Sequence, residues 1–283
     1  MSDLDVVVVN YNAGEYLLRC VASVYERSGG ADVDVIVVDN DSHDGSAGRA
    51  EAFFPQMRLI RNLHNRGFGA AANQGIVDGS GEWILLLNPD AEISAGDLAS
   101  LLAYARAHPR AGAIGVLVRD PDGTLYPSAR RVPSLMEATG HALVGPFKKD
   151  NRWSYAYTMG DWDRTSERSV DWVSGSSMLL RRSVIDKVGG FDPGFFMYAE
   201  DADLCARIRE AGYEVRFTPI VEVVHDHGLS TRGSKRMVWE HSRSIYRYFD
   251  KHYAKGWRRV LLPPAKAVMW LRAAIVSRSM WRS

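Results

Sequence analysis

Amide and carboxylate side chains directly follow three apolar runs in the first third of this 283-residue sequence. The polar residues at these positions are Asn10, Tyr11, Asp39, Asn88 and Asp90. Asn and Asp are common in turns, which would explain any one group alone. If the runs are parallel strands, however, their carboxyl ends share one edge of a sheet, where such sheets bind ligands. We therefore expect a nucleotide pocket there, with Asp39 contacting a base or ribose and Asp90 offering an oxygen ligand to a divalent cation.

A glycine-rich stretch begins at Asn65, and its Gly67-x-Gly69-x-x-Ala72 spacing matches the dinucleotide-binding fingerprint. That fingerprint belongs in the first strand–helix turn, whereas here it follows the third apolar run, so the match is weak evidence for a dehydrogenase. The alternative is a loop that opens a helix, with Arg66 and backbone N–H groups near a phosphate.

Three acids, Glu200, Asp201 and Asp203, follow the aromatic run Phe196-Met197-Tyr198. The helix dipole favours acids at a helix start, and this accounts for part of the pattern. Neighbouring carboxylates also raise each other's pKa, which suits a general base. We take Asp201 as the base, Glu200 as the second candidate and Asp203 as structural.

Two histidines, His225 and His227, directly follow the apolar run 221–224. A single histidine is more often structural than functional. At a strand end, in a chain that offers one carboxylate at Asp90, a histidine is also a candidate metal ligand.

The elements that would position these residues alternate along the first half of the chain. Strands are expected at 6–9, 33–38, 58–60, 83–87, 113–118, 177–180 and 221–224. Helices are expected at 14–27, 44–54, 68–77, 97–107, 201–211, 237–253 and 265–281. This alternation predicts an α/β fold with a Rossmann-like, mostly parallel sheet flanked by helices. Residues 120–170 have weak periodicity and are expected to form long loops of the kind that carry function.

Composition limits the classes of protein that the chain can represent. Apolar residues make up 46% and charged residues 24%, which excludes a disordered chain, a collagen-like chain and a disulfide scaffold. No run is long enough for a membrane span, and the acidic N-terminus does not resemble a signal peptide. Cys20 and Cys205 form no Cys-x-x-Cys pair, so a reducing, cytoplasmic compartment is expected.

Charge is distributed unevenly, because residues 251–283 hold eight Lys or Arg and no acid. The rest of the chain has a net charge of −7. A basic tail on an acidic body favours attraction to an anionic surface, whereas no nucleic-acid-binding motif is present. We expect 251–283 to form a basic amphipathic helix that lies in the membrane interface instead of spanning the bilayer. The alternative is that this helix packs on the catalytic domain or on a second subunit of a homodimer.

In their order and spacing, the motifs together resemble those of the inverting family 2 glycosyltransferases with the GT-A fold. The motifs are Asn10-Tyr11-Asn12, Asp39-Asn40-Asp41-Ser42, Asn65-x-Gly67-Phe68-Gly69 with Asn73, Asn88-Pro89-Asp90, Gly190-Phe191-Asp192 and Glu200-Asp201-x-Asp203. Residues 119–130 and 141–147 are similar to the actinobacterial rhamnosyltransferases of cell-wall linker synthesis. Those enzymes move L-rhamnose from dTDP-L-rhamnose to the 3-hydroxyl of polyprenyl-diphospho-GlcNAc.

The resemblance implies a role for each matching residue. Donor binding would involve Asn10, Tyr11, Asp39, Asn65, Arg66, Gly67, Asn73, Asn88, Asp90 and Arg130. Acceptor binding would involve Trp172, Ser174, Gly175 and Tyr198, although core packing is an equal explanation for Trp172. A divalent cation, Mg²⁺ or Mn²⁺, would be held by Asp90 and His225, since Gly228 and Ser230 then fall at the family's offsets.

The resemblance also implies a division of the chain and a location. Residues 1–250 would form the catalytic domain, with a nucleotide-sugar half at 1–118 and an acceptor half at 119–250. Residues 251–283 would hold the enzyme on the cytoplasmic face of the plasma membrane, where a lipid acceptor resides.

The expected chemistry is a single displacement at the anomeric carbon of the donor. The metal, with Arg130 or Arg131, would neutralise the departing diphosphate, and Asp201 would accept the proton of the acceptor hydroxyl. The alternatives are a related enzyme with another donor sugar or an O-antigen-type acceptor, and an inactive sugar-nucleotide-binding scaffold. The presence of both Asp90 and Asp201 argues against the scaffold.

Overall fold

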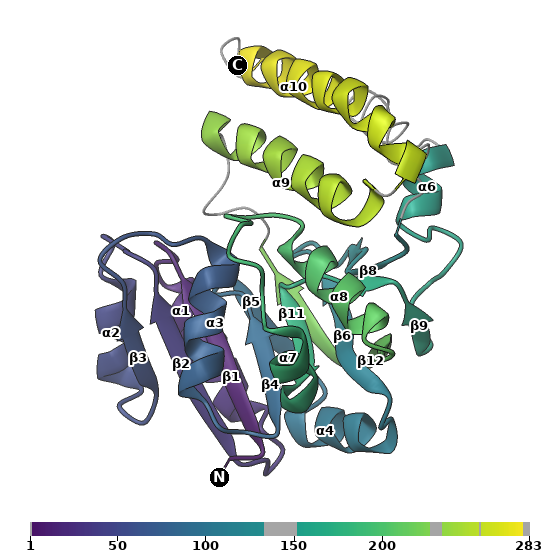
Figure 1. Ribbon diagram of the computed structural model, residues 1–283. Coiled ribbons are helices and arrows are strands. Elements are labelled where there is room, and N and C mark those ends of the chain that lie inside the picture. Colours follow the sequence, from purple (N-terminus) through teal and green to yellow (C-terminus); the bar gives the residue numbers. More distant parts are fainter. Residues whose placement is uncertain (1, 133–151, 227–233, 255, 280–283) are drawn as a thin grey trace.

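The computed structural model of the protein describes residues 2–132, 152–226, 234–254 and 256–279. A central sheet is flanked by helices, and two long helices lie together above one end of the sheet (Figure 1). The strands are β1 (Leu4–Asn10), β2 (Val33–Asp39), β3 (Arg58–Arg61), β4 (Trp83–Leu87), β5 (Ala91–Ala95), β6 (Ala111–Arg119), β7 (Leu125–Tyr126), β8 (Ala129–Arg130), β9 (Arg168–Val170), β10 (Trp172–Val173), β11 (Ser177–Arg181) and β12 (Glu214–His225). The α-helices are α1 (Tyr16–Glu26), α2 (Ser46–Phe53), α3 (Phe68–Asp78), α4 (Leu98–Ala107), α6 (Arg152–Tyr157), α7 (Arg182–Val188), α8 (Glu200–Glu210), α9 (Lys235–Tyr253) and α10 (Leu262–Ser279), and a 3₁₀ helix covers Gly256–Leu261.

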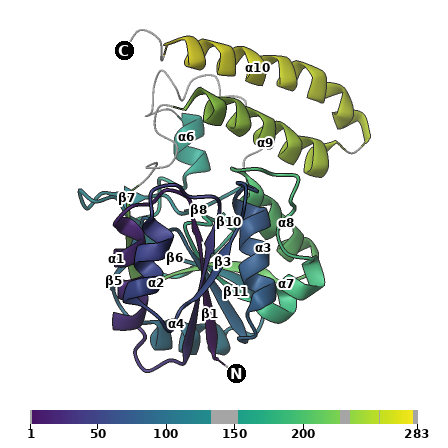
Figure 2. The same ribbon diagram turned by 90° about the vertical axis from the view of Figure 1, so that its left-hand side faces the viewer.

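The first half of the sheet is parallel, with β3, β2, β1 and β4 side by side in that order. Every residue of β1 and β4 is buried. A central strand that is covered on both faces has no solvent-facing side chains, which explains the continuous apolar runs in the sequence. Two apolar cores result, because α1, α2 and α4 cover one face of the sheet and α3, α7 and α8 cover the other (Figure 2). The expected Rossmann-like half is confirmed.

The second half of the sheet is mixed. β11 is antiparallel to β4 and β6, whereas β12 is parallel to β6 and antiparallel to β5. The sequence did not predict β5, and the strand expected at 221–224 is only the end of the much longer β12. Pro219 lies where the pairing of β12 with β6 shifts register, an irregularity that tolerates a residue without a backbone N–H. Through its pairing with β5, β12 carries His225 to the edge of the sheet where β4 ends.

The two C-terminal helices, α9 and α10, pack against each other, with the rings of Trp239 and Trp270 6.4 Å apart. The expected domain boundary at residue 250 therefore falls inside α9. α10 is present as expected, but it is not amphipathic. Ala273 is fully buried, whereas the apolar side chains of Leu271 and Ile275 are 63% and 49% exposed, so apolar residues lie on both faces. No helix in the described part of the chain has the length and hydrophobicity required to span a bilayer.

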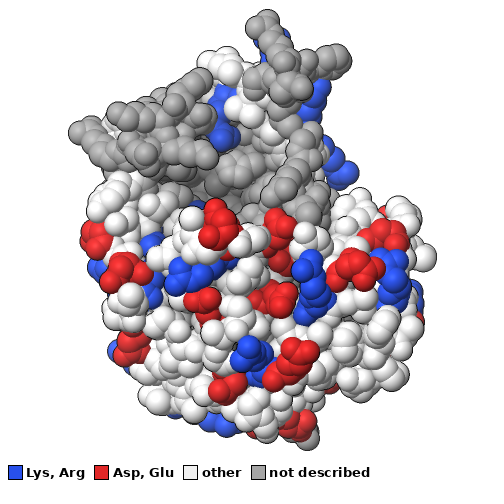
Figure 3. Space-filling model, turned by 180° about the vertical axis from the view of Figure 1, so that it is seen from behind, with Lys and Arg blue, Asp and Glu red and all other residues white. Residues whose placement is uncertain are grey.

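Acidic and basic side chains are interspersed on the face of the body that is turned away in Figure 1 (Figure 3). Several surface charges of the molecule are paired, as where Arg58 contacts Asp34 and Asp78 at 2.5 and 2.6 Å. Such partly exposed pairs contribute little to stability, so the apolar cores hold the body together.

Candidate active site

A cavity of about 800 Å³ lies at the carboxyl ends of β1 and β4, and residues of α8, α9 and α10 complete its walls. Twelve of the residues expected in the site line it: Tyr11, Asn65, Asn88, Asp90, Arg130, Trp172, Ser174, Gly175, Tyr198, Glu200, Asp201 and His225. Asn10, Asp39, Arg66, Gly67 and Asn73 are not among its lining residues. The structure therefore brings most of the expected donor, acceptor and catalytic residues into one cavity.

Asp90 and His225 face each other across the cavity edge, with Oδ1 of Asp90 2.9 Å from Nε2 of His225. The side-chain amide of Asn88 also lies 3.2 Å from the same imidazole nitrogen. The pairing of β5 with β12 creates this contact, and the backbone N–H of Asp226 donates to the carbonyl of Asp90. His227, the alternative histidine, lies outside the described residues.

One carboxylate oxygen and one imidazole nitrogen at this distance fit a divalent cation that accepts mixed ligands. No group of three His, Cys, Asp or Glu side chains suited to a metal occurs among the described residues. Protein ligands alone would leave the coordination sphere incomplete, so the phosphates of a substrate would have to supply the remaining oxygens. Imidazole is a better ligand for Mn²⁺ than for Mg²⁺, which strongly prefers oxygen.

Asn10 and Asp39 are buried and hydrogen-bonded to each other, and neither lines the cavity. The Asn10 amide donates to Oδ1 of Asp39 at 2.8 Å and to the hydroxyls of Ser42 and Ser46 at 3.0 and 2.9 Å. These bonds tie the end of β1 to the end of β2 and to the start of α2. The observed contacts of the Asn10 amide are therefore all within the protein.

Asn65 shapes the glycine-rich loop from within. Its Oδ1 accepts from the side chain of Asn40 at 3.0 Å and from the backbone N–H of Gly67 at 2.9 Å, while the N–H of Arg66 donates to Asn40 at 3.0 Å. Gly67 has a φ of +83°, and a Cβ there would clash with the carbonyl of Phe196. Only glycine lets this loop approach the segment that leads into α8.

Asn73 on α3 links the glycine-rich loop to the Gly190-Phe191-Asp192 motif. Its amide nitrogen donates to the carbonyl of Phe191 at 2.8 Å, and its oxygen accepts from the N–H of the same residue at 2.9 Å. The side chain thus satisfies both backbone groups of one buried residue, so its observed contacts are within the protein.

The two candidate catalytic acids stand at the first residues of α8. Tyr198 and Ala199, just before them, both have a positive φ (72° and 62°), a backbone conformation that is uncommon for residues other than glycine. This turn directs Glu200 and Asp201 into the cavity. Oδ2 of Asp201 accepts from the N–H of Gly175 at 3.1 Å, which fixes the carboxylate against the Ser174-Gly175-Ser176 segment.

Burial and mutual repulsion shift the titration of this acidic pair. Burial, together with the charge of Asp201, raises the pKa of Glu200 to about 8. Burial also raises the pKa of Asp201, but N–H groups of Gly175 and Ala202 and the charge of Arg130 oppose that rise. Oε2 of Glu200 has no hydrogen-bond partner among the described residues. The N–H groups and the charge of Arg130 therefore favour the ionised form at Asp201, whereas the surroundings of Glu200 favour its protonated form near neutral pH.

Arg130 lies among aromatic rings instead of pointing freely at the strand ends. Its guanidinium carbon is 4.9 Å from the ring centroid of Trp172 and 5.2 Å from that of Tyr157, and it donates to the hydroxyl of Tyr157 at 3.2 Å and that of Tyr126 at 2.9 Å. Trp172 is 8% exposed, so core packing explains most of its surface. Arg131 does not line this cavity but a smaller one beside β9.

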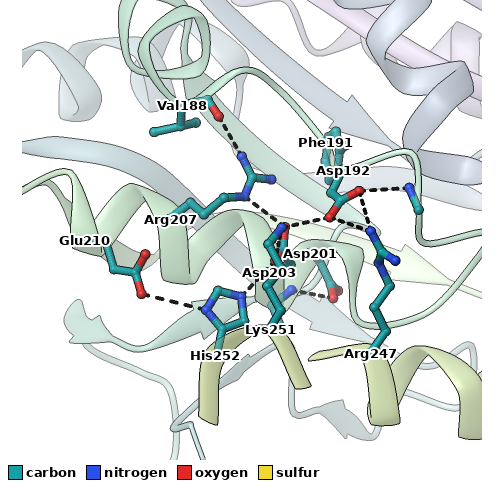
Figure 4. Close-up of polar contacts among 12 residues, drawn as sticks. Val188, Phe191, Asp192, Asp201, Asp203, Arg207, Glu210, Arg247, Lys251 and His252 are labelled. Carbon is teal, nitrogen blue, oxygen red and sulfur yellow. Dashed lines mark hydrogen bonds and ion pairs between the residues drawn. The ribbon is translucent and has the colours of Figure 1, made fainter. Parts of the chain in front are cut away.

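The sequence analysis did not predict a cluster of ion pairs that joins α9 to α8 and to Asp192 (Figure 4). We call this cluster the α8–α9 clamp. It consists of Asp192, Asp203, Arg207, Arg247, Lys251 and His252. Lys251 lies 2.8 Å from Asp192 and 2.7 Å from Asp203, and Nε2 of His252 lies 2.8 Å from the same oxygen of Asp203. The signal in the sequence was the repetition of cations at 247 and 251, one helical turn apart.

The sequence was compared with known proteins. Residues 5–189 match the family "Glycosyl transferase family 2", and residues 147–282 match "Glycosyl transferase family group 2". The N-acetylglucosaminyl-diphospho-decaprenol L-rhamnosyltransferase of Mycobacterium tuberculosis H37Rv is 38% identical over 99% of this chain and 94% of that protein. Rhamnosyltransferase WbbL of Escherichia coli K12 is 34% identical over 60% of this chain and 62% of its own length.

Solved structures share the fold at low sequence identity. GalNAc-T7 with UDP, GalNAc and Mn²⁺ superposes with a TM-score of 0.62 at 19% identity, over 90% of this chain and 50% of that one. The mannosyltransferase PcManGT of Pyrobaculum calidifontis, in complex with GDP-Man and Mn²⁺, gives 0.59 at 18% identity, over 98% and 75%. The expected GT-A fold is thereby confirmed. With its motifs gathered around one cavity and its sequence related over nearly its whole length to a curated family member, this chain is a glycosyltransferase that belongs to family 2.

Proposed function

We propose that the protein transfers L-rhamnose from dTDP-L-rhamnose to the 3-hydroxyl of a polyprenyl-diphospho-GlcNAc, with inversion at the anomeric carbon. The observation that carries this proposal is the 38% identity to the mycobacterial L-rhamnosyltransferase over 99% of the chain. A relationship that extends through the acceptor half and α10 supports a common acceptor, because the nucleotide half alone would not specify one.

Asp201 acts as the general base in this mechanism. Its carboxylate is oriented by the N–H groups of Gly175 and Ala202 and remains ionised because Glu200 holds the shared proton. As the acceptor oxygen attacks the anomeric carbon, its proton passes to Asp201 and the bond to the nucleoside diphosphate breaks. A positioned base contributes about 10²–10⁴-fold to such a step.

Asp90 and His225 would hold a divalent cation, for which the mixed ligand set favours Mn²⁺. The cation, when bound, neutralises the negative charge that develops on the leaving diphosphate. Asn88 lies beside the same imidazole and orients it. Asn65 and the glycine-rich loop shape the adjoining wall of the nucleotide end.

The test is transfer from a panel of sugar nucleotides to farnesyl-diphospho-GlcNAc with Mn²⁺, followed by mass spectrometry of the lipid product. We expect a deoxyhexose to be added from dTDP-L-rhamnose at a rate at least about tenfold above that from any other donor. Faster transfer from another donor would replace rhamnose as the donor sugar. Absence of transfer from every donor, with dTDP still bound, would favour the scaffold interpretation.

A further inference from the structure

A partly buried cation on α10 lines the cavity without a hydrogen-bond or ion-pair partner among the described residues. Arg272 faces the cavity together with Met269 and Val276, three and four residues away on the same side of the helix. Its Nε–H is buried and donates to no acceptor among the described residues, and none of these residues forms an ion pair with the guanidinium. Burial lowers the pKa of Arg272. An uncompensated charge in such a position costs free energy, which a bound anion would recover.

Two other cations, Arg130 in the cavity wall and Lys251 on α9, already have partners within the protein. Arg130 donates to two tyrosine hydroxyls and stacks on Trp172. Lys251 bridges Asp192 and Asp203 in the α8–α9 clamp. Arg272 therefore differs from these residues in having its donors available to a ligand.

The wall around Arg272 is apolar. Met269 and Val276 flank it on α10, and Ile245 and Phe249 line the same cavity from α9. A free nucleotide or inorganic phosphate would gain nothing from these side chains. An anionic group attached to an aliphatic chain would use both the cation and the apolar wall.

We propose that Arg272 binds the diphosphate of the lipid-linked acceptor, and that the facing sides of α9 and α10 enclose the first isoprene units. This proposal rests on the proposed function for the identity of the acceptor class. The planar guanidinium presents paired N–H donors that match phosphate oxygens. Asp90 and His225 serve the donor diphosphate at the strand ends, whereas α10 is the layer furthest from the sheet (Figure 1). The acceptor hydroxyl would then approach Asp201 from the side of α9 and α10.

The test is isothermal titration of the full chain with farnesyl diphosphate, without a sugar donor. Because no turnover is measured, the result does not depend on the identity of the donor sugar. We expect Arg272→Ala to weaken the binding of farnesyl diphosphate by at least about tenfold, because charge-assisted hydrogen bonds to phosphate are lost. Arg272→Lys keeps the charge and should weaken binding less. The matched control is Arg278→Ala, which removes the same charge from an exposed position of α10 and should change binding by less than twofold.

Titration with dTDP in the presence of Mn²⁺ distinguishes binding of the donor diphosphate from binding of the acceptor diphosphate. Arg272→Ala should bind dTDP within twofold of the wild type. It should unfold at the same or a higher temperature, because a partly buried charge with an unsatisfied Nε–H has been removed. Unchanged farnesyl diphosphate affinity in Arg272→Ala would overturn the proposal. The proposal would also be overturned if Arg272→Ala and Arg278→Ala lost the same farnesyl diphosphate affinity, or if Arg272→Ala lost affinity for dTDP alone.

Discussion

At the scale of single residues, the adjacent carboxyl groups of Glu200 and Asp201 determine what the site can do. Two buried carboxylates side by side cannot both be charged at low cost, so one keeps its proton. Backbone N–H groups donate to Asp201, and the positive charge of Arg130 also favours its ionised form. Oε2 of Glu200, in contrast, lacks a hydrogen-bond partner among the described residues. These surroundings favour the charged form of Asp201 over that of Glu200, as the proposed mechanism requires.

Replacing each acid by its amide distinguishes these two roles. Asp201→Asn should retain the fold and dTDP affinity but lose about 10²–10⁴-fold in turnover, because an amide cannot accept the proton. Glu200→Gln resembles the protonated form already present, so it should lose less than about tenfold at pH 7. The measurement is kcat for both variants with the same acceptor. The reverse order of losses would assign the base to Glu200.

The raised pKa of Glu200 also predicts a dependence of stability on pH. A carboxyl group with a pKa of 4.5 when unfolded and about 8 when folded binds more protons in the folded state between these values. Its contribution to the free energy of unfolding therefore falls as pH rises from about 4.5 to 8. Glu200→Gln removes this loss, so it should be more stable than the wild type at pH 8 by at least about 2 kcal/mol. Thermal unfolding at pH 5 and pH 8 checks this, and a difference that does not grow with pH contradicts it.

Asp90 and His225 carry the predicted metal dependence. Asp90→Ala removes the one carboxylate of the pair and should abolish the increase in dTDP affinity that Mn²⁺ produces in the wild type. His225→Ala should reduce the preference for Mn²⁺ over Mg²⁺, because the nitrogen ligand is lost. Calorimetric titration with dTDP, with and without each metal, measures both effects. A full metal-dependent increase in Asp90→Ala would remove Asp90 from the ligand set.

The local sequence indicated which residues belong near the site, but not what each one contacts. The order of the motifs predicted that Asp90, Glu200, Asp201 and His225 share one site, and all four line one cavity in the structure. It could not show that the amides of Asn10 and Asn73 bond within the protein, because an asparagine has the same donors and acceptors for a ligand as for a backbone. Those partners lie 29 and 118 residues away, beyond the reach of any local pattern.

At the scale of elements, the α8–α9 clamp joins α9 to α8, the helix that begins with Glu200 and Asp201. Asp203 is fully buried, and burial alone would raise its pKa, but hydrogen bonds from His252 and Lys251 and the charge of Arg207 hold it below its usual value. Burial of Asp192 is likewise outweighed by hydrogen bonds from Lys251, Gly194 and Arg247, so its pKa is well below the usual range. Asp192 and Asp203 are therefore engaged within the protein, next to the segment that carries the proposed base Asp201.

Breaking the clamp at Lys251 should destabilise the protein. Lys251→Met leaves Asp203 buried with one charge partner fewer and should cost about 1–2 kcal/mol, since the lysine is partly exposed. The depressed carboxylate pKa values mean that this stabilisation is present above about pH 4 and is lost as pH falls further. Arg243→Met, which removes an exposed partner of Glu240 on the same helix, is the control and should cost less than about 0.5 kcal/mol. Urea unfolding at pH 7 compares the variants, and equal costs would show that the clamp adds nothing.

Periodicity predicted elements well where burial is uniform and poorly where it is not. β1, β2 and β4 were predicted because both faces of these strands are covered. β5 was missed because it follows a turn directly and alternates between buried and exposed residues over only five positions. In β12 the interruption at Pro219 concealed the first part of the strand.

At the scale of the whole molecule, the two faces of α10 differ in what they present. Met269, Arg272 and Val276 point into the cavity, while Leu271 and Ile275 are exposed on the other side with Arg278 one turn further. An outer face with two large apolar side chains and a cation suits the boundary of an anionic membrane, where a lipid acceptor would be found. The same helix could then contact the bilayer and admit the acceptor, which a separate amphipathic anchor could not do.

The double variant Leu271→Glu/Ile275→Glu tests this orientation without removing the wall of the cavity. Burial of a large aliphatic side chain contributes about 1.5–3 kcal/mol, so loss of both should lower the affinity for vesicles of anionic phospholipid by more than about tenfold. Val77→Glu on α3, which is an even more exposed apolar position on the body, should leave binding unchanged. Co-sedimentation at two salt concentrations measures the effect, and the wild type should bind less at the higher one because salt screens the cations.

Undiminished vesicle binding by the double variant would exclude the outer face of α10 as the contact. Conversion of a wild-type dimer to a monomer in analytical ultracentrifugation would instead assign this face to a second copy of the chain.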